Sequence, residues 1–111
     1  MVIRQSSPFG SATRTRSLLA IRFLEESYPR ELARLLDERL FSIQRALMSL
    51  ERDGLVSARS RGRTRLYRLE PRYFARRELA AYLDRLATQE AELDSRIRQL
   101  RLRPRRTGKR L

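Results

Sequence analysis

The chain has 111 residues, and 26 lysine and arginine residues against 13 acids give it a net charge of +13 at pH 7. A chain of this length buries one modest core, so we expect a single domain with short appendages, and its charge favours a polyanionic partner. With neither cysteine nor histidine it lacks disulfides, thiol nucleophiles, the commonest general base and the usual zinc ligands. We therefore expect no enzyme activity, no cofactor and no metal site.

The N-terminal part is expected to be an arm followed by a helix. Residues 1–10 show little periodicity and contain Ser-Ser-Pro and a glycine, which predicts a flexible arm. Ser11 suits the N-cap of a helix over residues 12–26. The positions of this helix that can face a core are Leu18, Ile21 and Leu24. Leu19 and Phe23 lie to one side, where they either extend the core or form part of a dimer interface.

Two short helices around a turn come next. Pro29 fits the first turn of a helix over about residues 29–36, because its φ is fixed and its missing N–H needs no partner there. A second helix is predicted over about residues 41–52, since apolar residues recur there at spacings of three and four. Those core-facing positions are Ile43, Ala46, Leu47 and Leu50.

The opposite face of this second helix is free to meet a ligand. A major groove about 12 Å wide admits one helix, and glutamine and arginine side chains suit adenine and guanine edges there. Gln44 and Arg45 lie in the first turns of the helix and are our candidate base contacts. Ser42 and Ser49 are candidates for contacts to bases or phosphates from the same helix.

A β-hairpin with an arginine-rich tip is predicted after Gly54. Strand-like runs over residues 55–59 and 65–69 flank residues 60–64, where Gly62 supplies the positive φ of a hairpin tip. Between Arg59 and Arg77 there are eight arginines and one acid. The candidate wing contacts to the DNA backbone or minor groove are Arg59, Arg61, Arg63 and Arg65. We take residues 11–74 as one winged-helix domain, with Tyr73 and Phe74 packing back on it.

Residues 75–103 predict one long helix with a heptad seam. The seam consists of Leu79, Leu83, Leu86, Glu90, Leu93, Ile97 and Leu100, spaced alternately by four and three. Such a seam favours self-association; the alternative is a helix that packs back on its own domain. The candidate dimerisation residues are Leu19, Phe23, Leu86, Leu93, Ile97 and Leu100. Residues 104–111 are expected to be a basic, disordered tail that attracts phosphates.

The runs ELARLL, SIQRALMSLERDGLV and GRTRLYRL, preceded by SATRTRSLLAIRFLEE, resemble the ArsR-type winged-helix transcription regulators of bacteria and archaea. The resemblance covers about residues 11–87 and implies a winged helix that represses transcription as a homodimer on operator DNA. Two features depart from that family. The cysteines and histidines of its metal-sensing branch are absent, and Leu40 and Phe41 stand where small polar residues usually precede the recognition helix.

The sequence thus predicts a mainly α fold with a small β-hairpin, a winged helix-turn-helix with a long C-terminal helix. The expected function is sequence-specific regulation of transcription by a homodimer on double-stranded DNA, with repression implied by the resemblance. No apolar run suits a membrane span or a signal peptide, so a cytoplasmic location is expected. Two alternatives stay open: a protein-interaction module that docks through Leu40, Phe41 and Met48, and a non-specific, charge-driven binder of DNA or RNA.

Overall fold

The computed structural model describes the backbone of residues 9–102 and all their side chains except 91–94, 101 and 102. The elements in order are α1 (Ala12–Leu24), α2 (Pro29–Leu36), α3 (Leu40–Arg52), β1 (Val56–Arg61), β2 (Thr64–Leu69), α4 (Arg76–Ala87) and α5 (Ala91–Leu102). Helices dominate, and the two strands form an antiparallel hairpin, so the predicted fold class is confirmed. The predicted tail and most of the predicted arm lie outside the described residues.

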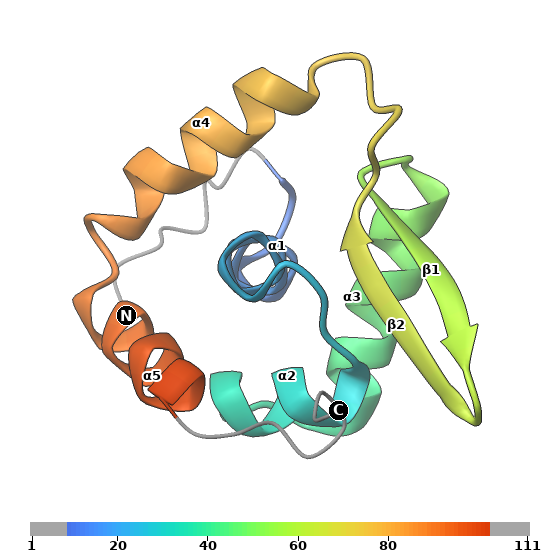
Figure 1. Cartoon of the computed structure of the whole chain (residues 1–111), viewed down its shortest axis with the longest axis horizontal. Coiled ribbons are helices and arrows are strands. Elements are labelled where there is room, and N and C mark those ends of the chain that lie inside the picture. Colours follow the sequence, from blue (N-terminus) through green and yellow to red (C-terminus); the bar gives the residue numbers. More distant parts are fainter. Residues whose placement is uncertain (1–8, 103–111) are drawn as a thin grey trace.

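Helix α1 is the centre of the molecule. Figure 1 views it end-on, with the four other helices and the hairpin around it. Its side chain at Ser11 accepts a hydrogen bond from the Arg14 N–H at 3.1 Å, which confirms the predicted N-cap. Four consecutive residues expose 1% of their surface or less: Leu18, Leu19, Ala20 and Ile21. A helix that is covered on every side needs apolar residues all round, and so Leu19 belongs to the core of this chain.

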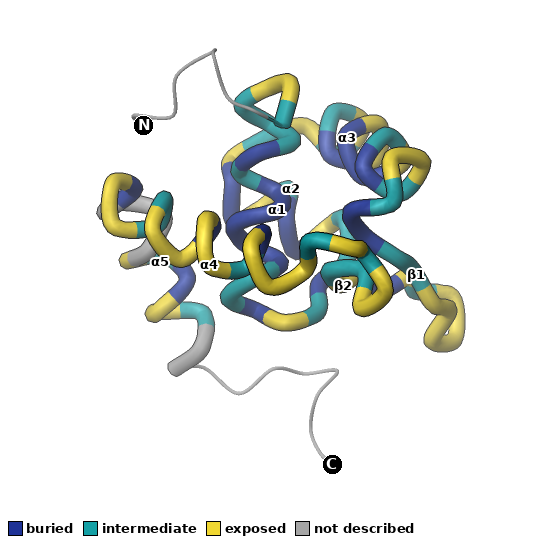
Figure 2. Tube along the Cα trace, turned by 90° about the horizontal axis from the view of Figure 1, so that it is seen from above, coloured by how far each residue is buried: buried dark blue, intermediate teal, exposed yellow. Residues whose placement is uncertain are grey.

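The helix-turn-helix follows the predicted pattern closely. Helix α2 has the predicted bounds, and α3 begins one residue earlier than expected, at Leu40. Between them Asp37 takes a left-handed conformation with φ of 55°, which ends α2 and turns the chain. Figure 2 shows buried positions concentrated in the inner helices and exposed positions along the hairpin tip. The inward faces of α2 and α3 therefore complete the core around α1.

The hairpin is tighter than predicted. Arg61 pairs with Thr64, so Gly62 and Arg63 alone form the turn, and Gly62 has the expected positive φ of 62°. At its base, the Ser27 N–H donates to the Tyr67 carbonyl at 3.0 Å and the Tyr67 N–H donates to the Ser27 carbonyl at 2.7 Å. The wing is therefore fixed to the segment that joins α1 to α2.

The expectation of one continuous C-terminal helix is wrong, because the chain turns between α4 and α5. The Thr88 hydroxyl donates to the Arg85 carbonyl at 2.7 Å, and the N–H groups of Gln89 and Glu90 donate to carbonyls three residues back. A straight helix over residues 75–103 would run about 43 Å, whereas the 13 residues of α1 span only about 20 Å. The turn lets both halves of the apolar seam reach α1.

Most of that seam accordingly packs within the chain. Leu79, Leu83 and Ile97 belong to the core, while Leu86 and Leu100 pack against it with part of their surface exposed. Tyr73 also packs there, but Phe74 is 91% exposed, so the expected inward packing of Phe74 is wrong. Among the helices described, none has the length and apolar character needed to cross a membrane.

The packing of α4 on α1 can be tested at Leu83, which is fully buried. Leu83→Ala should lower the free energy of unfolding by about 2–5 kcal/mol, because it leaves a cavity between the two helices. Arg77→Ala, at an exposed position of the same helix, should change it by no more than about 0.5 kcal/mol. Urea unfolding at one protein concentration measures both. Equally small effects would mean that α4 does not cover α1 in solution.

Candidate nucleic-acid interface

Helix α3 presents a broad outward face opposite its core positions. With 100° per residue, Phe41, Arg45, Met48 and Arg52 point most directly away from the core, and Gln44 lies at the edge nearer the hairpin. All five side chains are exposed. The predicted base contacts Gln44 and Arg45 therefore lie on a surface that is accessible to a ligand.

The two serines lie at the other edge of α3, and both are half-buried. The Ser49 hydroxyl accepts a hydrogen bond from the Arg14 guanidinium, which also donates to the Asp53 carboxylate at 2.9 Å. Arg14 thus joins the start of α1 to the end of α3. Ser42 shares the Ser49 side of the helix, so the structure separates these two residues from the outward face that carries Gln44 and Arg45.

The four wing arginines also divide into groups. In the hairpin register Arg59 and Arg61 share one face, Arg65 lies on the opposite face, and Arg63 belongs to the turn. Arg65 donates to the Glu51 carboxylate at 2.9 Å and to the Tyr67 hydroxyl at 3.1 Å, which connects the wing directly to α3. Arg63 and Arg65 consequently face α3, whereas Arg59 and Arg61 face away from it.

On that other face, Arg59 forms a two-pronged pair with Glu26, at 2.8 and 3.0 Å. The hydrogen bond from Arg59 lowers the pKa of Glu26 below its ordinary value, and the charges of Arg59, Arg68 and Arg61 act in the same direction against the effect of burial. The same pair raises the pKa of Arg59. Arg59 therefore fixes the wing to the α1–α2 segment before any ligand arrives.

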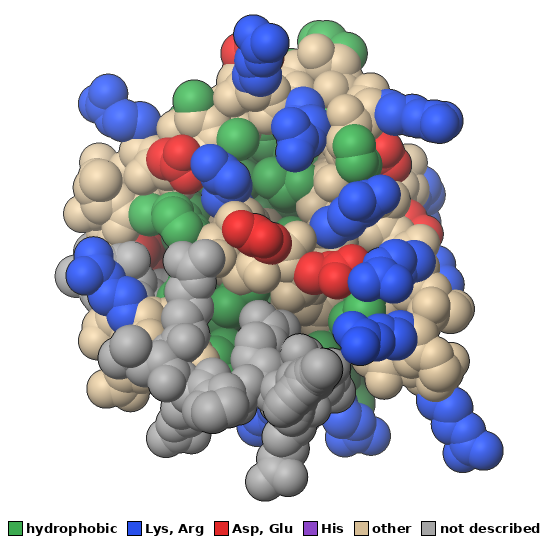
Figure 3. All heavy atoms as spheres, in the orientation of Figure 1, with side chains coloured by type: hydrophobic (Ala, Val, Ile, Leu, Met, Phe, Trp, Pro, Cys, Tyr) green, Lys and Arg blue, Asp and Glu red, His purple; other side chains and the backbone are tan. Residues whose placement is uncertain are grey.

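A groove of about 760 Å³ lies between α3, the start of α2 and the hairpin. Its lining includes four arginines and one acid, and that acid, Glu51, is already paired with Arg65. The arginines are Arg30, Arg45, Arg63 and Arg65. Figure 3 shows basic side chains standing out from the surface on the side where α3 and the hairpin lie. The groove thus suits an anionic ligand with an edge that accepts and donates hydrogen bonds.

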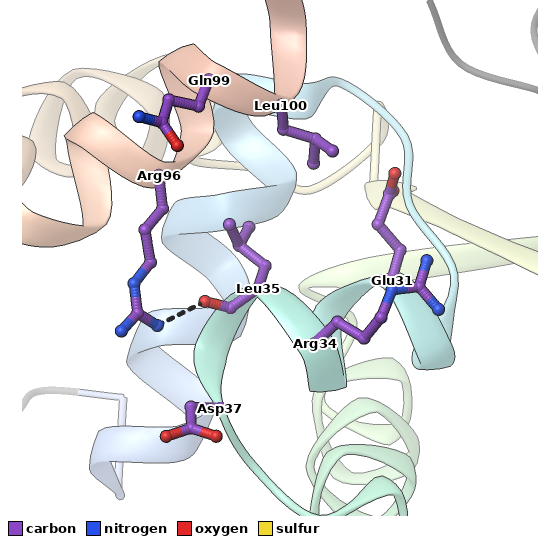
Figure 4. A pocket seen from close by; sticks show the side chains of 7 residues that line it. All are labelled: Glu31, Arg34, Leu35, Asp37, Arg96, Gln99 and Leu100. Atoms are coloured by element: carbon purple, nitrogen blue, oxygen red, sulfur yellow. Dashed lines mark hydrogen bonds between the residues drawn. The ribbon is translucent and has the colours of Figure 1, made fainter. Parts of the chain in front are cut away.

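A second hollow of about 470 Å³ lies between α2 and α5 (Figure 4). Its lining is Glu31, Arg34, Leu35, Asp37, Arg96, Gln99 and Leu100. The Arg96 guanidinium donates to the Leu35 carbonyl at 2.9 Å, drawn as the dashed line in Figure 4. This bond ties α5 to the helix-turn-helix. Leu100, a candidate dimerisation residue, faces this hollow.

The candidate dimerisation residues take different places. Leu19 and Ile97 are buried inside the chain, with 1% and 3% of their surface exposed. Phe23, Leu86 and Leu100 are half-buried and keep surface for a partner. The side chain of Leu93 lies outside the described residues.

The sequence assigns Phe41 and Met48 to the alternative of a protein-docking patch, and it does not predict that acids hold two of the wing arginines. Phe41 is 66% exposed and Met48 is 62% exposed, both on the outward face of α3. Their spacing of seven residues, with Arg45 between them, is a helical stripe that could have been found from the sequence. The pairing of Arg59 with Glu26 could not, because 33 residues separate them.

The fold and the site together define a winged helix-turn-helix, with α3 as its outward helix and the β1–β2 hairpin as its wing. No protein-family profile matches the chain, and no curated protein sequence does. Solved structures of the same fold are found.

Three of these structures are winged-helix transcription regulators of the MarR family. Wild-type ZitR from Lactococcus lactis in complex with DNA is 16% identical with a TM-score of 0.57, and the match covers 90% of this chain and 66% of ZitR. The repressor AdcR from Streptococcus pyogenes is 14% identical with a TM-score of 0.60, and the match covers 86% of this chain and 69% of AdcR. A mutant of MarR from E. coli complexed with operator DNA is 22% identical with a TM-score of 0.57, and the match covers 78% of this chain and 61% of MarR.

This chain therefore spans between 61% and 69% of the length of those three proteins. At such low identities the likeness establishes the winged-helix fold.

The Arg59–Glu26 pair gives a pH prediction. Because the folded-state pKa of Glu26 is lowered from its ordinary value of 4.5, the stabilisation is complete above about pH 4.5 and is lost as the pH falls through the lower, folded-state value. Glu26→Gln keeps an oxygen acceptor but does not titrate. The difference in free energy of unfolding between wild type and Glu26→Gln should therefore be largest near neutral pH and shrink in acid. Urea unfolding from about pH 3 to about pH 7 measures it, and a constant difference would contradict the prediction.

Proposed function

We propose that this protein is a sequence-specific, DNA-binding transcription regulator that acts as a homodimer. The observation that carries the proposal is the groove between α3 and the wing, which is lined by four arginines and by Gln44. In this arrangement α3 enters the major groove, where Gln44 and Arg45 contact base edges. Arg61 and Arg63 contact phosphates or the minor groove beside it.

Charge and fold support the same conclusion. A net charge of +13 destabilises a chain of this size by self-repulsion, and a phosphate backbone relieves that repulsion. ZitR and MarR, which have the same fold, were solved with DNA. A regulator that works on chromosomal DNA in a bacterium or archaeon belongs in the cytoplasm, which is where we place this one.

Repression is favoured over activation on likeness alone. The sequence resembles ArsR-type regulators, and the structural neighbour AdcR is named a repressor. Since the solved structures are of the MarR family, the ArsR-like assignment stays a prediction, supported by runs such as ELARLL and GRTRLYRL and by the shared winged-helix fold.

One observation favours a different class of function. Phe41 and Met48 are large, apolar and exposed, and such side chains also dock proteins. Selection of bound sites from a random DNA library separates the possibilities. An enriched palindrome is the result expected for the regulator. Strong, salt-sensitive binding without enrichment would indicate a non-specific binder, and absence of binding a protein-interaction module.

The roles of helix and wing give a prediction about specificity. Gln44→Ala or Arg45→Ala should weaken binding to the selected operator by about 1–3 kcal/mol and binding to random DNA much less, because base contacts carry the sequence information. The measurement is a salt titration of binding to both DNAs. If the helix variants lose affinity equally on both, Gln44 and Arg45 do not read bases.

Wing variants should behave differently. Arg61→Ala or Arg63→Ala should weaken binding to operator and random DNA alike. Each should also lower the slope of log K against log salt by roughly 1 for every phosphate that the missing guanidinium no longer neutralises, twice that in a symmetric dimer. Arg77→Ala removes the same charge from α4 and is the control. A wing variant that loses affinity only for operator would show that the wing reads minor-groove shape instead.

The homodimer gives a third prediction from this proposal. Leu86 keeps part of its surface exposed on α4, on the predicted seam. Leu86→Glu should raise the dissociation constant of the dimer by about tenfold or more, because it puts a charge in an apolar contact. Ala81→Glu, an exposed site on the same helix, introduces the same residue and should leave the dimer intact. Sedimentation over a range of concentrations measures both; an unchanged dimer in Leu86→Glu would move the interface elsewhere.

A further inference from the structure

Two large apolar side chains stand on the surface that the proposed function gives to DNA. Phe41 and Met48 are 66% and 62% exposed and lie two helical turns apart on the outward face of α3. Both line the groove between α3 and the wing, together with Gln44 and Arg45. A single exposed apolar residue is ordinary, but two on one stripe with hydrogen-bonding side chains between them form a surface with mixed chemistry.

The groove around them is basic. Arg30, Arg45, Arg63 and Arg65 line it, and its one acid, Glu51, is held by Arg65 at 2.9 Å. An occupant must therefore be anionic along its edges and apolar at isolated points. The major groove of DNA has this chemistry, since phosphates line its walls and the thymine 5-methyl group is the apolar feature of its floor.

We propose that Phe41 and Met48 contact thymine methyl groups and thereby set part of the sequence specificity. The inference rests on the proposed function and adds a base preference to it. From Phe41 to Met48 the helix rises about 10 Å, and successive base pairs are about 3.4 Å apart, so the two contacts fall about three base pairs apart in each half-site. Gln44 and Arg45 read purines between them.

Phe41 has a second effect. The guanidinium carbon of Arg45 lies 5.7 Å from the centroid of the Phe41 ring, within the range of a cation–π interaction. The ring thus restricts where Arg45 can point and places its guanidinium on the groove side of α3. Phe41 is a positioning residue for Arg45 as well as an apolar contact, whereas Met48 provides the apolar contact alone.

The test replaces thymine by uracil, which lacks only the 5-methyl group, one position at a time in the selected operator. For wild-type protein, uracil at a contacted position in one half-site should weaken binding by about fourfold, because the burial of one methyl-sized group is lost. A change in both half-sites should weaken it by about 15-fold in a symmetric dimer. Other thymines should show no effect.

Variants then assign each methyl group to a residue. Met48→Ala should abolish the uracil effect at one position and keep it at the other, and Phe41→Ala should do the reverse. Phe41→Leu, which keeps an apolar side chain but not the ring, should retain the uracil effect while discrimination at the Arg45 position falls. Because both side chains are exposed, circular dichroism should confirm that the variants fold. Phe74→Ala removes an exposed aromatic residue outside the groove and is the control.

The outcomes separate this inference from the proposed function. A wild-type protein that selects an operator but binds its thymine and uracil forms equally overturns the methyl contacts and leaves the regulator intact. Alanine variants that bind operator as tightly as wild type would likewise overturn them and would show that the apolar stripe has no role in DNA binding. A chain that selects no sequence fails both proposals.

Discussion

The burial of the middle of α1 is the constraint on which the rest of the structure depends. Helices α2 to α5 and strand β2 all contact it, and Leu18 to Ile21 leave almost nothing exposed. Fully burying a leucine or isoleucine side chain contributes about 1.5–3 kcal/mol, so this one helix accounts for a large share of the hydrophobic stabilisation. Since α1 touches both the helix-turn-helix and the C-terminal helices, it also fixes the position of the outward face of α3 relative to the predicted dimerisation surface.

Charge is distributed so that some arginines hold the fold while others remain for a ligand. The arginines that pair with acids elsewhere in the chain include Arg14, Arg16, Arg22, Arg59 and Arg65. Exposed pairs contribute at most about 1 kcal/mol each, but these also reduce self-repulsion in a strongly basic chain. The groove keeps Arg30, Arg45 and Arg63 in addition, so the structural pairs leave it basic.

Local signals in the sequence were enough for the elements that they define. Pro29 and the apolar spacing predicted α2 at its observed bounds, and Gly62 predicted the hairpin tip. The errors concern features that depend on packing between residues far apart in the sequence. Whether residues 75–103 form one helix or two depends on the length of α1. The heptad spacing within residues 75–103 carries no information about that length. The exposure of Phe74 also depends on such packing, and the Ser49 hydroxyl is held by Arg14 from 35 residues away.

The wing is already connected to α3 and to the segment between α1 and α2, and this affects how the proposed site would work. Arg65 bonds Glu51 of α3 on one face of the hairpin, and Arg59 bonds Glu26 on the other, while Ser27 and Tyr67 pair through their backbones. One of these contacts joins the wing to α3, and the other two join it to the segment between α1 and α2. A groove that is already ordered loses less conformational entropy on binding than a mobile one. In the proposed regulator, selectivity would then depend on the fit of side chains such as Gln44, Arg45, Phe41 and Met48, since the backbone that carries them is already in place.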